Sequence, residues 1–149
     1  QTSSMLEFLR LAGNNPDRLA IALHEYSYLT EDIADAYPYK VGRFQELFRI
    51  ADAQGFPRPT VLITEWGWTY DHVPSPDEAI QDVAWASRLY APYPEVKGAA
   101  IWYLGNGFQG IADETQRLIY PVMAYTLQNY FTAPLPPTRA SITPEQFAP

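Results

Sequence analysis

The stretch Thr60-Val-Leu-Ile-Thr-Glu-Trp66 is the clearest predicted β-strand of this 149-residue chain. Its apolar residues are adjacent rather than alternating with polar ones, which is typical of a parallel strand that is buried on both faces. Two further short apolar runs, at residues 19–26 and 98–104, predict two more strands of this kind. The chain is therefore expected to contain a parallel sheet.

Amphipathic segments alternate with the three strands and predict helices. Ser4 and Glu7 have the spacing of a capping box, and Ser75, Pro76 and Glu78 form a second helix start. Apolar residues recur at helical intervals in four segments, at residues 4–13, 41–54, 75–89 and 120–131. The order α-βα-βα-βα predicts a parallel α/β fold.

The composition excludes several classes of protein. Seventeen acidic and ten basic side chains give a net charge of −7 without a basic cluster, so no nucleic-acid partner is expected. No run reaches the roughly 18 apolar residues of a membrane span, so no membrane partner is expected. The lack of cysteine excludes disulfides and thiolate metal sites but leaves the compartment open. No phosphate, dinucleotide or metal motif is present, so neither a cofactor nor a metal is expected.

Residues 1–132 are expected to form one domain, since domains typically run about 100–200 residues. The segment 133–149 is rich in proline and is expected to be a tail or linker. The first residue is Gln1 rather than methionine, so we expect the chain to be processed or to be a piece of something longer.

The chemistry is expected at the carboxyl ends of the strands, where functional groups collect in parallel α/β folds. His24-Glu25-Tyr26, Thr64-Glu65-Trp66 and Trp102-Tyr103 each follow an apolar run. Strict alternation along a strand would place Glu65 on the face of Val61 and Ile63. A carboxylate that ends a row of buried residues needs partners or a cavity, so Glu65 is either a nucleophile or acid/base, or a structural glutamate held by its neighbours.

Two residues of the first strand are the expected partners of Glu65. His24 and Tyr26 share one face of their strand, and either could hydrogen-bond the carboxylate of Glu65. Glu25 points to the opposite face and is expected to cap, pair or face solvent. A lone histidine is more often structural than catalytic, but its position beside a tyrosine at a strand end favours a function.

Aromatic residues are unusually frequent, at 15% of the chain, and many follow the strand ends. Trp102 is either a core residue or a platform for the C–H face of a sugar ring. The loop aromatics suggest a carbohydrate groove, although protein interfaces use the same residue types. These aromatics are Trp66, Trp68, Tyr70, Tyr28, Tyr37 and Tyr39.

Over about residues 3–131, the chain resembles the C-terminal part of a clan-A retaining glycoside hydrolase, a (β/α)8 barrel of the cellulase, xylanase and β-xylosidase type. The matching motifs are His24-Glu25-Tyr26, Ile63-Thr64-Glu65-Trp66-Gly67 and Ile101-Trp102, in family order. The resemblance implies a partial TIM barrel that consists of one helix and the last three βα units. It also implies that Glu65 is the nucleophile, that His24 and Tyr26 assist it, and that Trp102 binds the sugar.

The family's acid/base glutamate follows an asparagine, and this chain has no Asn-Glu pair. Retaining hydrolysis needs two carboxyl groups about 5–5.5 Å apart, so the chain alone is expected to be inactive or nearly so. Two alternatives are a non-catalytic carbohydrate-binding or scaffold module and a small doubly wound α/β domain. An open sheet face made of Ala22, Val61, Ile63 and Ala100 would favour self-association or pairing with a missing N-terminal half.

Overall fold

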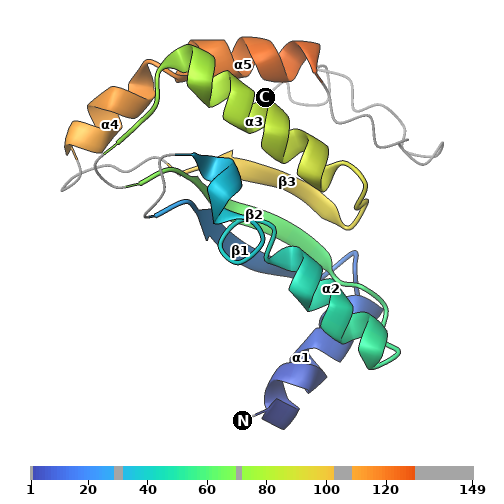
Figure 1. Ribbon diagram of the computed structural model, residues 1–149. Coiled ribbons are helices and arrows are strands. Elements are labelled where there is room, and N and C mark those ends of the chain that lie inside the picture. The colour runs from blue at the N-terminus through green and yellow to red at the C-terminus, as the bar shows by residue number, and fades with distance from the viewer. Residues whose placement is uncertain (1, 29–31, 70–71, 103–108, 130–149) are drawn as a thin grey trace.

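The computed structural model describes residues 2–28, 32–69, 72–102 and 109–129. Within them, three parallel strands form a sheet in the order β1-β2-β3, with bounds Ala20–Tyr26, Thr60–Gly67 and Val96–Ile101. Helices precede, separate and follow the strands (Figure 1): α1 (Thr2–Asn14), η1 (Ile33–Ala36), α2 (Phe44–Ala53), α3 (Pro76–Tyr90), α4 (Gln109–Gln116) and α5 (Ile119–Gln128). The expected α/β class with parallel strands is confirmed. The predicted tail at 133–149 and the loop after Trp102 lie outside the described residues.

The hydrophobic core lies between the sheet and its helices. Helices α2 and α3 contribute to one continuous buried cluster with β2, so both pack on the same face of the sheet (Figure 1). The main members of this cluster are Phe44, Phe48, Val61, Ile63, Trp66, Ala79, Ala86 and Tyr90, all at most 4% exposed.

The opposite face of the sheet carries exposed side chains. Ala22, Thr64 and Ala100 are exposed, and Leu62 is 40% exposed. The prediction that the strands are buried on both faces is therefore wrong within the described residues. The predicted membership of the open face also needs correction, because Val61 and Ile63 lie under the helices while Ala22 and Ala100 do not.

Local sequence signals account for the helix ends. The predicted capping box at Ser75 is confirmed: the Ser75 amide donates to Glu78 Oε2 at 2.9 Å, and the Glu78 amide donates to Ser75 Oγ at 3.4 Å. Helix α2 ends where Gly55 adopts a left-handed backbone with φ of 68°, as its Gln-Gly sequence predicts.

The structure corrects two predicted element starts and adds one helix that the sequence did not predict. Helix α1 begins at Thr2, so Ser4 lies inside it, and the Glu7 carboxylate pairs with Arg10 rather than closing a capping box. Strand β3 begins at Val96, two residues earlier than predicted. Helix α4 was not predicted, because its sequence, Gln-Gly-Ile-Ala-Asp-Glu-Thr-Gln, has a glycine near its start and few apolar positions.

The most consequential difference is a β-bulge in β2. Leu23 of β1 aligns with Ile63, but the next residue, His24, aligns with Glu65, so Thr64 is an extra residue in the register. The extra residue shifts the alternation by one position. Glu65 therefore does not share the face of Val61 and Ile63, as strict alternation predicts, and Trp66 takes the core-facing position instead.

No helix in the described part of the chain has the length and apolar character needed to cross a membrane. The described residues likewise contain no group of three histidine or acidic side chains placed to bind a metal ion.

The contribution of the capping box at Ser75 to stability can be measured by substitution. We expect Ser75→Ala to lower the free energy of unfolding by about 1 kcal/mol, because it leaves the Glu78 amide without its acceptor. Urea unfolding followed by circular dichroism measures this change. Gln81→Ala, at an exposed position in the middle of α3, is the control and should cost nothing. Equal losses in the two variants would contradict the capping role.

Candidate functional site

Glu65 and its two partners form the centre of the candidate site. The Tyr26 hydroxyl donates to Glu65 Oε2 at 2.7 Å, and His24 Nδ1 lies 3.2 Å from the same oxygen. The Glu65 side chain is 29% exposed and that of His24 is 52% exposed. The expected contact of Glu65 with Tyr26 and His24 is confirmed. Among the described residues the other carboxylate oxygen, Oε1, has no hydrogen-bond partner, so one oxygen is held and the other is available.

The bulge at Thr64 is what brings these groups together. His24 and Tyr26 alternate with the buried Glu25, so they point to the face of the sheet that α2 and α3 do not cover. Glu65 reaches that face because the extra residue reverses the alternation after Ile63. Without the bulge, the carboxylate would point into the apolar layer under the helices, where an unpaired charge is costly.

Trp102 joins this group from the end of β3. Its backbone amide donates to the Trp66 carbonyl at 2.8 Å, which continues the sheet by one residue. Its indole meets the Tyr26 ring edge to face, with ring centroids 5.5 Å apart and planes at 78°. Four of the predicted site residues, His24, Tyr26, Glu65 and Trp102, are thus brought together at the carboxyl ends of the three strands.

Trp66 and Trp68 are not part of this group. Trp66 is 2% exposed and Trp68 is 8% exposed, and their rings pack against each other in the core under the helices. The Trp68 indole N–H donates to Asp82 Oδ2 at 2.7 Å, and burial raises the pKa of that carboxyl. That these two tryptophans bind substrate stays a prediction, and at this degree of burial neither ring lies on the surface beside Glu65.

Tyr28 and Lys40 extend the site beyond the predicted residues. Tyr28 has a φ of 58°, a left-handed conformation that is uncommon for tyrosine, and its ring centroid lies 5.2 Å from that of Tyr26. Lys40 Nζ lies 5.8 Å from the Tyr28 ring centroid. The sequence placed Tyr28 among the loop aromatics but gave no sign that Lys40 approaches them, since the two are twelve positions apart along the chain.

Glu25 has a structural role. The sequence predicted that it would cap, pair or face solvent, without indicating which. Its side chain is fully buried, and Oε2 accepts hydrogen bonds from the Gly42 amide at 2.9 Å and from the Tyr90 hydroxyl at 2.7 Å. Burial raises the pKa of Glu25, while the bonds from Gly42, Tyr90 and the backbone amides at the start of α2 lower it, with burial prevailing. The N-terminus of a helix favours a nearby negative charge, and Glu25 of β1 supplies it for α2. Burial, and next the charge of Glu25, raise the pKa of Tyr90.

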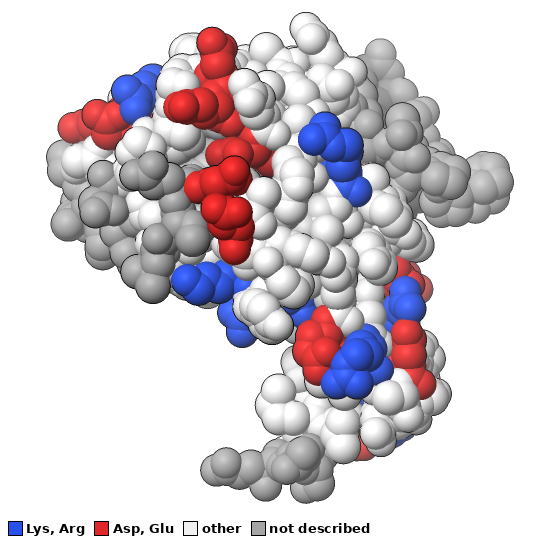
Figure 2. Space-filling model, in the orientation of Figure 1, with Lys and Arg blue, Asp and Glu red and all other residues white. Residues whose placement is uncertain are grey.

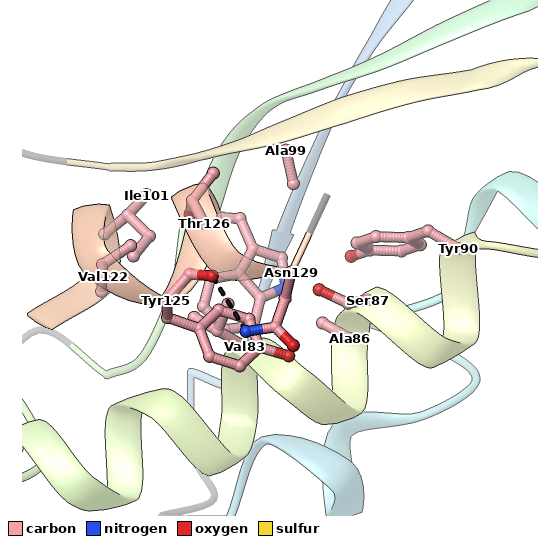
Figure 3. A pocket seen from close by; sticks show the side chains of 11 residues that line it. Val83, Ala86, Ser87, Tyr90, Ala99, Ile101, Val122, Tyr125, Thr126 and Asn129 are labelled. Carbon is pink, nitrogen blue, oxygen red and sulfur yellow. Dashed lines mark hydrogen bonds between the residues drawn. The ribbon is translucent and has the colours of Figure 1, made fainter. Parts of the chain in front are cut away.

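Cavities in the described part of the chain are alternative sites, and one of about 340 Å³ is lined mainly by apolar residues of β3 and α5 and not by Glu65. A space of about 120 Å³ lies between β3, α3 and α5 and is lined mainly by apolar side chains, among them Ala86, Ile101 and Val122 (Figure 3). At its rim, Asn129 donates to the Tyr125 carbonyl at 3.0 Å. Glu65 does not line it, and a further space of about 20 Å³ beside Tyr26 and Trp102 has room for little more than a water molecule. A ligand of Glu65 would therefore bind on the open surface.

Comparison of the chain with protein-family models, with curated proteins and with solved structures gives no match.

The buried carboxylate predicts a specific pH dependence of stability. Because the pKa of Glu25 is raised in the folded protein, the native state takes up a proton at a higher pH than the unfolded chain, whose glutamate pKa is about 4.3. The wild type should therefore gain stability relative to Glu25→Gln as the pH falls from neutral to about 4.3, and lose it again as the pH rises.

Urea unfolding of both proteins over this pH range measures the difference. Glu46→Gln, at an exposed site on α2 whose carboxylate pairs with Arg49, is the matched control. Because the ion pair lowers the pKa of Glu46, the wild type should show no comparable gain over the control variant on acidification. A pH-independent difference between the wild type and Glu25→Gln would contradict the raised pKa.

Proposed function

We propose that this chain carries the nucleophile of a retaining β-glycosidase, with Glu65 as the attacking group. One observation above all supports the proposal: Tyr26 and His24 both contact the same oxygen of a partly exposed carboxylate at the end of a parallel strand. This is the arrangement expected of a nucleophile that is oriented by a hydrogen bond while its second oxygen stays accessible. Unlike Glu46 on the surface of α2, whose two oxygens are both engaged by Arg49, Glu65 has one oxygen held and one accessible.

In the proposed reaction, Glu65 Oε1 attacks the anomeric carbon as the bond from that carbon to the leaving oxygen breaks. A glycosyl ester of Glu65 forms, and the leaving group departs with the electrons of the broken bond. Water then attacks the same carbon, which releases the sugar with retained configuration and restores the carboxylate. Tyr26 and His24 keep the carboxylate aimed by holding Oε2, and the indole of Trp102 offers an apolar ring beside them.

The leaving oxygen needs a proton, and its source is not apparent in this sequence, which has no Asn-Glu pair. We propose that further strands complete a (β/α)8 barrel over the open face of the sheet and supply the acid/base group. Three features support this: α2 and α3 pack on one face of the sheet, the other face exposes Ala22, Leu62 and Ala100, and the outer edges of β1 and β3 pair with no strand in the described part of the chain.

The second candidate function is a carbohydrate-binding or scaffold α/β domain without chemistry. The missing Asn-Glu pair favours it, since a binding module needs only the aromatic surface and not a second carboxyl group. The two candidates differ in one measurable property, which is whether Glu65 becomes covalently bound to a sugar.

A trapping experiment tests the nucleophile. A 2-deoxy-2-fluoro β-glycoside with a dinitrophenolate leaving group needs little protonation, so it can report on Glu65 without the acid/base. We expect mass spectrometry to find the sugar on the peptide that contains Glu65, and to find none after Glu65→Gln, which keeps the shape and removes the charge. Glu46→Gln, on the surface of α2, should label like the wild type. Label on another peptide, or undiminished label in Glu65→Gln, would rule out the assignment.

The open face predicts association. We expect sedimentation equilibrium to show that the isolated chain forms dimers or larger species, because an uncovered apolar sheet face with two open edges favours pairing. Leu62→Lys, which places a charge on this face, should shift the equilibrium toward the monomer. Gln81→Lys, on the exposed side of α3, adds the same charge elsewhere and should not. A compact monomer at high concentration would count against this.

A further inference from the structure

The turn before α2 brings two cations to the edge of the candidate site. Arg43 Nη1 lies 3.4 Å from the carbonyl oxygen of His24, and Lys40 Nζ lies 5.8 Å from the ring centroid of Tyr28. Tyr28 in turn packs on Tyr26, whose hydroxyl holds Glu65. Both cations therefore border the residues that contact the carboxylate.

These two cations have no carboxylate partner among the described residues, although the chain as a whole is acidic. Arg10, Arg49, Arg58 and Arg117 each form an ion pair with an acidic side chain. Within the described residues Lys40 and Arg43 form none within 4.0 Å, which is true also of Arg18, Arg88 and Lys97, but only Lys40 and Arg43 are seen beside the residues that contact Glu65. On the face drawn in Figure 2, a column of acidic side chains lies beside a separate group of basic ones. Positive charge without a local partner leaves hydrogen-bond donors for an anionic ligand.

The turn that carries Lys40 and Arg43 is held in place rather than loosely attached. Gly42, between them, is buried and donates its amide to the fully buried carboxylate of Glu25 at 2.9 Å. The φ of Gly42 is 89°, and a Cβ atom there would lie 2.8 Å from the Tyr37 ring, so the turn requires glycine. Because Glu25 stands between His24 and Tyr26, the same residue fixes the cations and the two partners of Glu65 relative to each other.

We propose that Lys40 and Arg43 form a subsite for the carboxylate of an acidic sugar, so that the glycoside cleaved at Glu65 carries a uronate residue. Cleavage of the glycoside rests on the proposed function, whereas binding of the sugar carboxylate at this subsite can be tested without it. Arg43 would offer its planar guanidinium to the carboxylate and Lys40 a point charge. A neutral sugar would gain nothing from either cation.

The test is a binding measurement on the whole chain in the Glu65→Gln background, so that no chemistry is needed. The indole N–H signal of Trp102 in a nitrogen–proton NMR spectrum reports on titration with methyl β-glucuronide or with methyl β-glucoside. We expect the glucuronide to bind about tenfold more tightly, as a charge-assisted hydrogen bond provides, and the preference to shrink as salt is added.

Lys40→Met/Arg43→Met should abolish the preference by lowering the affinity for the glucuronide to that for the glucoside. Arg88→Met/Lys97→Met is the matched control, because it removes the same net charge near the opposite end of the strands and should keep the preference. Lys40→Gln/Arg43→Gln repeats the test if the methionine variant unfolds.

Equal affinity for the two sugars, a preference lost equally in both double variants, or no response to either sugar would overturn the subsite. If the glucuronide preference persists and depends on Lys40 and Arg43 while Glu65 takes up no label in the trapping experiment, the proposed function fails and the subsite stands. If Glu65 is labelled and no preference for the glucuronide is found, the proposed function stands and the subsite is refuted.

Discussion

The extra residue in β2 is the constraint on which the rest of the site depends. Ile63 must point into the core, where it is 1% exposed, and Glu65 must point out of it to meet Tyr26 and His24. Two residues that are two positions apart share a face in a regular strand, so both requirements can be met only if the alternation is broken between them. Thr64 breaks it, and Trp66 thereby becomes a core residue rather than a surface one.

A second carboxylate, that of Glu25, connects the carboxyl end of β1 to the helices on the covered face of the sheet. Glu25 binds the start of α2 through the Gly42 amide and the end of α3 through Tyr90, so it connects both helices to β1. The cost of burying this charge is only partly offset, by hydrogen bonds from backbone amides and a hydroxyl rather than by a basic side chain, and the pKa of Glu25 is therefore raised. Glu25 and Glu65, at the ends of adjacent strands, thus have opposite environments: one carboxylate is sealed into the helix layer and the other stays open to solvent.

The sequence predicted what depends on local signals. The three strands, the start of α3 at Ser75 and the end of α2 before Gly55 follow from apolar runs, a capping box and a left-handed glycine, all of which act within a few residues. The bulge left no such signal, because it is defined by the register between β1 and β2 and not by the composition of β2 alone. The placement of Trp66 and the approach of Lys40 to Tyr28 were missed for the same reason, since each depends on contacts between distant parts of the chain.

The open face of the sheet connects the fold to the proposed chemistry. A carboxylate nucleophile works best in a site that excludes water, because electrostatic interactions strengthen as the local dielectric falls. Here the Glu65 side chain is 29% exposed and its neighbour His24 is 52% exposed, on a face without a covering layer in the described residues. Leu62 is exposed on this same face, and covering it would be favourable. A layer of further strands would cover the apolar face, which stabilises the fold. The same layer would exclude water from the nucleophile and bring an acid within reach of the leaving oxygen.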